Sequence, residues 1–198
     1  TAAFDYLLIG RRVLFDATGF DDVRAQGRGR LSKTPVLLPV RLTARRVTGV
    51  GDVAGGILAN LSIDGVLRVT AKSITGDGLV LKSDKLRGKL SLFLDLVTGR
   101  YDVGVSGQLA RYLIPGVGLV DVITDLQVVP GPGGRGTSVQ GRGRAWVRRF
   151  DNAFLRSLAG GLPRIEARLI RGLDGVLIFR DLVLIGPTVR IAGNGLRR

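Results

Sequence analysis

The sequence contains no cysteine, no histidine and no methionine. The first two absences exclude disulfides, thiolate chemistry and the usual zinc sites, and they remove the commonest general base. The lack of cysteine is compatible with an oxidising bacterial periplasm. Because the chain starts at Thr1 and holds no methionine at all, we expect it to be a segment of a longer protein.

Catalytic groups are also scarce among the remaining residue types. Asp121 and Asp125 would share one face of a strand about 13 Å apart, at a rise of about 3.3 Å per residue. Glycosidase carboxylates lie about 5–9.5 Å apart, although a pair formed across two strands stays open. The stretch Arg87-Gly88-Lys89-Leu90 lacks the Ser or Thr after lysine and the upstream glycine of a phosphate-binding loop. We therefore expect no enzyme, no cofactor and no metal site.

Long hydrophobic runs are missing too. The longest uncharged run, Val53 to Ile63, is far shorter than the roughly 18 residues that a transmembrane helix needs. The beginning of the chain also lacks the basic and then apolar pattern of a signal peptide. We expect any membrane anchor or export signal to lie outside this chain.

What the chain does have is alternation of apolar and polar residues. Of its 198 residues 45% are hydrophobic but only 6% aromatic, and 30 glycines separate the apolar segments. Alternation with period two predicts half-buried strands, and short connections such as Thr98-Gly99-Arg100 predict antiparallel hairpins. The residues expected on one apolar sheet face are Leu67, Val69, Leu79, Leu81, Leu90, Leu92, Leu94, Leu96, Tyr101, Val103 and Val105.

The flanking segments have the same pattern, so the fold class expected is all-β, mainly antiparallel, with one or two short helices. Helical spacing occurs at Phe150, Phe154, Leu155 and Leu158, with Asp151 as the expected N-cap. It occurs again after Asp52, at Val53, Ile57, Leu58 and Leu61. A loop is expected at 130–134. Further strands are expected at 12–15, 23–31, 36–46, 118–128, 137–148, 165–170, 176–185 and 188–196.

Gly-x-Gly recurs at 27–29, 76–78, 141–143 and 193–195. Alternate glycines leave one strand face bare, so that a backbone or ligand can approach closely or the sheet can bend. The irregular recurrence suggests a repeat array in which each unit packs on its neighbours. We expect residues 1–198 to form a single segment of such an array.

The formal charge of +14 favours anionic partners. Basic clusters at Arg28/Arg30, Arg142/Arg144 and Arg148/Arg149 have two interpretations: contact with the phosphates of lipid or nucleic acid, or an outer sheet face kept soluble by charge. Nucleic acid is disfavoured because few aromatic residues lie near these arginines to stack on bases. The apolar face likewise fits either an ordinary sandwich core or an open groove that holds acyl chains.

The stretch from Leu67 to Gly107, with its Gly-x-Gly strand ends and alternating leucines, resembles the TamB family. This family is the inner-membrane-anchored, periplasm-spanning component of the translocation and assembly module. The chain is similar more broadly to AsmA-like and repeating β-groove proteins. The resemblance implies an elongated curved sheet, a β-taco with an apolar concave face, and no catalytic residues.

The resemblance also implies a function and a location. The apolar residues named above would line a groove that shields phospholipid acyl chains between membranes, or that assists assembly of outer-membrane β-barrels. Expected partners are phospholipid or a nascent outer-membrane β-strand, a TamA-like barrel and flanking segments of the same chain, but no nucleic acid. The expected location is the periplasm of a Gram-negative bacterium, anchored in the inner membrane by a region outside this chain.

Two other functions stay open. A structural β-solenoid, such as a surface passenger domain, would normally carry more Asn, Ser and Thr and less Arg. A basic nucleic-acid-binding β-domain would show an affinity that falls steeply with salt, and it would need surface aromatics.

Overall fold

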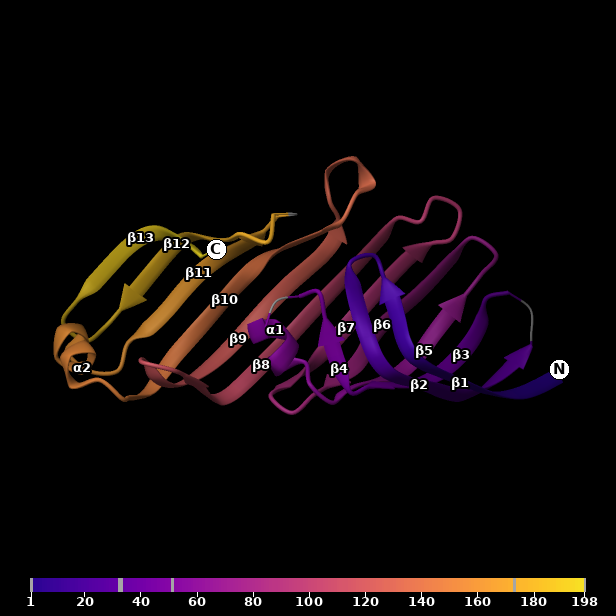
Figure 1. Cartoon of the computed structure of the whole chain (residues 1–198), viewed down its shortest axis with the longest axis horizontal. Coiled ribbons are helices and arrows are strands. Elements are labelled where there is room, and N and C mark those ends of the chain that lie inside the picture. Colours follow the sequence, from indigo (N-terminus) through magenta and orange to yellow (C-terminus); the bar gives the residue numbers. More distant parts are fainter. Residues whose placement is uncertain (1, 32–33, 51, 173, 198) are drawn as a thin grey trace. The chain divides into compact units, whose positions relative to one another are not determined.

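The computed structural model describes residues 2–31, 34–50, 52–172 and 174–197. Within them the chain forms thirteen strands and two short α-helices, which confirms the all-β prediction (Figure 1). None of the described helices is long and apolar enough to cross a membrane. The elements are β1 (Ala2–Phe15), β2 (Thr18–Leu31), β3 (Val36–Ala44), β4 (Arg46–Thr48), α1 (Asp52–Ile57), β5 (Leu61–Val69), β6 (Ser73–Lys82), β7 (Leu86–Asp95), β8 (Tyr101–Ile114), β9 (Gly118–Pro130), the 3-10 turn η1 (Pro132–Gly134), β10 (Thr137–Phe150), α2 (Ala153–Ala159), β11 (Arg164–Arg171), β12 (Leu177–Ile185) and β13 (Arg190–Arg197).

The strands join in one open sheet in the order β1-β2-β3-β5-β6-β7-β8-β9-β10-β11-β12-β13, while β4 pairs with β2. Nearly all neighbouring strands are also consecutive in the chain. Short turns join them, and short turns can connect only antiparallel strands. The contacts divide the chain into two compact units. The first unit holds residues 1–105 and 128–137, and the second holds 106–127 and 138–198.

The core of the first unit is aliphatic. Near one end of the strands, α1 and its following turn are fixed to the β6–β7 turn. The Ser83 hydroxyl donates to the Ile57 carbonyl at 2.6 Å, and the Asp84 N–H donates to the Ala59 carbonyl at 3.1 Å. The buried hydrophobic residues of this unit are Val23, Ala44, Val47, Leu61, Leu79, Leu81, Leu86 and Tyr101.

The second unit has its own core between β8, β9, β10, β11 and α2. Val120, Val147, Phe150 and Ala159 are its buried centre. Partly buried side chains surround them, so this unit buries apolar surface without residues from the first. The surrounding residues are Tyr112, Ile114, Val117, Val122, Leu155 and Ile165.

Several predicted element boundaries are wrong. The N-cap of α2 is Asn152, whose side chain accepts from the N–H groups of Phe154 and Leu155, whereas the predicted cap, Asp151, forms an ion pair with Arg149. Leu61 was expected on the first helix but begins β5. That helix is only six residues long, and the side chains of Asp52 and Val53 lie outside the described part of the structure.

The first strand begins ten residues earlier than the predicted 12–15 segment, at Ala2. The reason is physical: Leu7, Leu8 and Ile9 are 55%, 54% and 71% exposed, so both faces of this part of β1 are apolar and no alternation marks it. The predicted segment 36–46 is also interrupted, because Arg45 separates β3 from β4.

A β-bulge in β6 keeps its apolar residues on one face. Gly76 pairs with Leu92 and Leu79 pairs with Leu90, so Asp77 and Gly78 together oppose a single residue of β7. Gly76 and Leu79 are three positions apart, so in a regular strand they would lie on opposite faces of the sheet. The extra residue of the bulge keeps them on the same face. Gly78 has a φ of 62°, a left-handed conformation that other residues adopt only at a cost.

This bulge gives a direct test of the fold. An alanine Cβ at Gly78 or at Gly193 would meet no atom within 4 Å, but only Gly78 has a positive φ. We expect Gly78→Ala to lower the free energy of unfolding by about 1 kcal/mol, measured by urea denaturation. The matched Gly193→Ala change should stay within about 0.5 kcal/mol of the original chain. Equal effects of both substitutions would contradict the assigned bulge.

Candidate functional site

The first unit carries a continuous apolar face, which we name the aliphatic face. Residues that pair across antiparallel strands point to the same side of a sheet. Leu38 pairs with Leu67, Leu67 with Gly76, and Gly76 with Leu92, so this row crosses four strands without a charge. The neighbouring row is Val36, Val69, Ile74 and Leu94, and further members are Val40, Leu42, Ile63, Leu79, Leu81 and Leu90.

Strand β8 extends the aliphatic face by a fifth strand. The Asp95 N–H donates to the Arg100 carbonyl at 2.8 Å, which closes the β7–β8 hairpin. Counting outward from this bond places Tyr101, Val103 and Val105 opposite leucines of β7 that already belong to the face. A Cβ on Gly104 would lie 2.5 Å from the Ser91 hydroxyl, as this register requires.

Burial changes along the aliphatic face. Leu79 and Leu81 are 2% and 3% exposed and form core with Leu61 and Leu86. Toward the other end, Leu67, Leu92 and Leu94 are only half-buried, whereas Gly76 and Tyr101 are buried. One end of the face is therefore ordinary core, and the other end keeps apolar surface in contact with solvent.

The tip of the β1–β2 hairpin lies against the aliphatic face at Tyr101. The Phe15 ring packs edge-on against Tyr101, with ring centroids 4.8 Å apart. The Thr137 hydroxyl donates to Asp16 at 2.9 Å, so the Tyr101 hydroxyl is the donor in its own 2.9 Å bond to Thr137. Because β2 pairs with β3 and the hairpin tip contacts β8, the hairpin crosses over part of the face.

The structure brings together ten of the eleven residues that the sequence placed on one face. The exception is Leu96, which lies beyond the end of β7 in the turn and is 47% exposed. Tyr101 lies on the face but is buried beneath Phe15. The sequence predicted a strand at 36–46 but did not place Val36, Leu38, Val40 and Leu42 of β3 on this face, because that assignment needs the register with β5.

The opposite face of the same strands is polar. Arg41 forms an ion pair with Asp64 across β3 and β5, and Lys82 pairs with Arg87 across β6 and β7. Scattered apolar residues such as Phe93, 45% exposed, interrupt this polarity without forming a row. The contrast between the two faces means that the aliphatic face can offer van der Waals contact and exclusion of water, but no directed polar contact.

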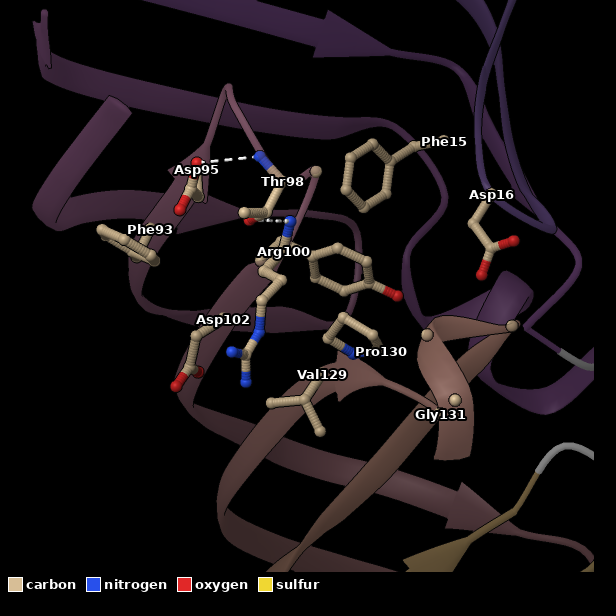
Figure 2. A pocket seen from close by; sticks show the side chains of 15 residues that line it. Phe15, Asp16, Phe93, Asp95, Thr98, Arg100, Asp102, Val129, Pro130 and Gly131 are labelled. Atoms are coloured by element: carbon tan, nitrogen blue, oxygen red, sulfur yellow. Dashed lines mark hydrogen bonds between the residues drawn. The ribbon is translucent and has the colours of Figure 1, made fainter. Parts of the chain in front are cut away.

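A cavity of about 970 Å³ lies in the first unit where the β1–β2 turn meets the β7–β8 turn. Figure 2 shows Phe15 and Asp16 facing Asp95 and Arg100 across it. The lining mixes charged with apolar side chains, and it includes Tyr101 of the aliphatic face. Its other lining residues are Phe93, Thr98, Gly99, Tyr101, Asp102, Val129, Pro130, Gly131, Gly133, Gly134 and Gly136.

Asp95 closes the β7–β8 turn through its carboxylate. The backbone N–H of Thr98 donates to Asp95 Oδ1 at 3.0 Å (Figure 2), and the backbone N–H of Val97 donates to the same atom at 2.8 Å. These bonds, that of Thr98 most and then that of Val97, favour the charged form and lower the pKa of Asp95 from its ordinary value.

The lowered pKa predicts an acid-dependent turn. The bonds stabilise the fold above the ordinary carboxyl pKa, about 3.9, and this contribution is lost as pH falls through the lower folded-state pKa. We expect Asp95→Asn to lower the free energy of unfolding at neutral pH. The difference from the original chain should shrink as the pH falls below about 4. Urea midpoints of both chains across this range would measure the effect. An effect of Asp95→Asn that is independent of pH would contradict it.

The acids considered for catalysis are used differently. Asp121 accepts from the Arg111 N–H at 2.7 Å and from Arg148, and these contacts, Arg111 first, lower its pKa. A general acid needs a raised pKa, so this environment is opposite to the one such chemistry requires. Asp125 accepts from the Ser106 hydroxyl at 2.7 Å. Within the described ranges, no three His, Cys, Asp or Glu side chains are grouped to hold a metal ion.

Comparisons with family models, curated proteins and solved structures find no match to this chain. The resemblance to the TamB family therefore stays a prediction from the sequence pattern.

Proposed function

We propose that this chain is a lipid-shielding segment of a TamB-like envelope protein, in which the aliphatic face covers the acyl chains of phospholipids as they move between membranes. The observation that carries the proposal is the uncharged row that runs from Leu38 through Leu67 and Gly76 to Leu92, half-exposed at its members on β5 and β7. The sequence resemblance supports the same function.

The chemistry of the face suits a fluid and variable ligand. Acyl chains present no hydrogen-bonding group, so their binding depends on apolar area and not on directed contacts. The five strands of the face span about 19 Å at a strand spacing of about 4.8 Å. Aliphatic side chains without large aromatic anchors allow such a ligand to lie in many positions, as transport along a surface requires.

The gradient of burial also favours a groove over a closed core. A sandwich core would bury its central positions from both sides, as Leu79 and Leu81 are buried here. Leu90, Leu92 and Leu94 of β7 are instead only half-buried. A partly exposed apolar row of this kind is a surface for another apolar molecule.

The test is the phospholipid content of the chain purified from bacteria, measured by native mass spectrometry and lipid extraction. Leu92→Asp places a carboxylate in the aliphatic face and should remove most of the bound phospholipid, because a charge cannot be desolvated against acyl chains without a large cost. Phe93→Asp is the matched control, since Phe93 follows Leu92 on the same strand but points to the polar face. It should leave the lipid content unchanged.

Both variants must first show the circular dichroism spectrum of the original chain. A folded original chain that carries no phospholipid and melts cooperatively would sink the proposal and favour a closed core. Equal loss from the two variants would mean that the lipid lies elsewhere on the protein.

A second candidate function, capture of an outer-membrane β-strand, is favoured by β1. This strand stands at one end of the strand order, so one side of its backbone has no strand partner in the described ranges. Its residues Leu7, Leu8 and Ile9 are all more than half exposed. An apolar edge strand of this kind is a template for another strand.

Strand capture predicts a different response. An unfolded outer-membrane barrel protein added to the chain should slow hydrogen exchange of the β1 amides. Ile9→Lys should abolish this protection, because a charged edge blocks strand addition, while the phospholipid content stays the same. Ile191→Lys on β13, the strand at the other end of the order, is the matched control and should leave β1 protection intact. Unchanged β1 exchange in the original chain would exclude this function.

A further inference from the structure

Three arginines lie side by side across neighbouring strands of the second unit. Arg142 of β10 pairs with Arg168 of β11, and Arg168 pairs with Arg180 of β12. We name these three residues the arginine row. Directly paired residues share a sheet face, with Cα atoms about 4.5–5.5 Å apart. Like charges in this position destabilise a sheet, so the row needs an explanation beyond strand pairing.

The charges of the arginine row are not balanced. Arg168 lies 3.3 Å from Asp181, and both side chains are well exposed, at 74% and 68%. Arg142 and Arg180 have no carboxylate partner among the described residues. Over the next two rows on the same face, Arg144 and Arg164 share a single carboxylate, Glu166, at 3.8 and 3.1 Å. In these rows, strands β10 to β12 therefore place five guanidinium groups against two carboxylates.

Solubility alone does not account for this arrangement. The opposite face of the same strands is uncharged where Gly141 pairs with Leu169 and Leu169 pairs with Phe179. At these positions the charge is thus gathered on one side and is mostly of one sign, whereas Arg171, one row further on, lies on the opposite face. A face that only had to stay soluble would be more stable with opposite charges across each pair.

Next to the arginine row, on the same face, lies an apolar row. Ile170 and Ile178 pair with each other, and Ile178 pairs with Leu196 of β13, which is 67% exposed. These residues lie two positions along the strands from Arg168 and Arg180, a distance of about 6.6 Å. The two rows together present cationic donors beside exposed aliphatic surface.

We propose that this face is a phospholipid headgroup site, in which the arginine row binds the phosphate and the apolar row contacts the glycerol and first acyl carbons. Guanidinium groups bind phosphate through paired, charge-assisted hydrogen bonds, and a phosphate between three of them relieves their mutual repulsion. The site uses none of the residues of the aliphatic face and lies in the other unit, so it does not depend on the function proposed above.

Nucleic acid fits this face less well. Single strands bind by stacking bases on aromatic rings beside the basic residues. On the strands β10 to β12, Phe179 points to the uncharged face, and Trp146, which pairs with Arg164, is half-buried. The surface beside the arginine row is aliphatic instead, which suits a ligand that is anionic at one end and apolar at the other.

The experiment is flotation of the full chain with vesicles of phosphatidylcholine, alone or with phosphatidylglycerol. The variant Arg142→Gln/Arg180→Gln should weaken binding to the anionic vesicles about tenfold or more, from the loss of two charge-assisted contacts. Arg68→Gln/Arg87→Gln is the matched control, because it removes the same charge from exposed arginines of the first unit. It should weaken binding less than about threefold, through the general field alone.

Two further arms identify the ligand. Leu196→Ser should weaken vesicle binding but leave binding of inorganic phosphate unchanged. Leu92→Asp should leave vesicle binding unchanged, and this result would separate the headgroup site from the aliphatic face. Equal loss in the two arginine double variants would overturn the site. Vesicle binding that is unchanged by Leu196→Ser would mean that the site binds free phosphate and not phospholipid. The site would be assigned to nucleic acid if a single-stranded oligonucleotide bound more tightly than the vesicles and the Arg142→Gln/Arg180→Gln variant lost that binding.

Discussion

Strand register is the constraint on which the rest of this structure depends. In an antiparallel sheet each residue lies on the same face as its cross-strand partner. The apolar sides of neighbouring strands therefore form one continuous face only where each register pairs apolar residues with apolar residues. A slip of one residue between β6 and β7 would set Leu90 and Leu92 on the polar side. The extra residue at Asp77-Gly78 is therefore required by the pattern on either side of it.

The second unit obeys the same constraint with a different device. Strand β12 has an irregularity between Phe179 and Leu182, where Asp181 takes a positive φ of 51° and its N–H donates to the Asn194 side chain at 3.1 Å. This irregularity leaves Leu182 on the uncharged face with Phe179. It also places the Asp181 carboxylate beside Arg168, so one local distortion sets both the apolar pattern and the charge of the opposite face.

Much of the fold follows from the sequence, because alternation reports on strands that have one buried side. It predicts β7 and β8 well and marks the Leu67–Val69 end of β5, whose first residue was expected on a helix. It fails for β1, where Leu7 to Ile9 are exposed on both sides. Capping is harder to predict, since Asp151 and Asn152 are equally suitable and only the ion pair of Asp151 with Arg149 separates them. The arginine row was not predictable, because Arg142, Arg168 and Arg180 meet only once the registers of three strands are known.

An open apolar face must stay exposed enough to bind a ligand and covered enough to remain folded. Here the two demands fall on different ends of the same strands. Leu79 and Leu81 supply the stability of a closed core, whereas Leu67 and Leu92, on the two strands that flank β6, are only half-buried. The Phe15 contact with Tyr101 covers the β8 side of the face. A substitution at the closed end should therefore act on folding, and one at the open end on binding, which is the separation that a transport surface needs.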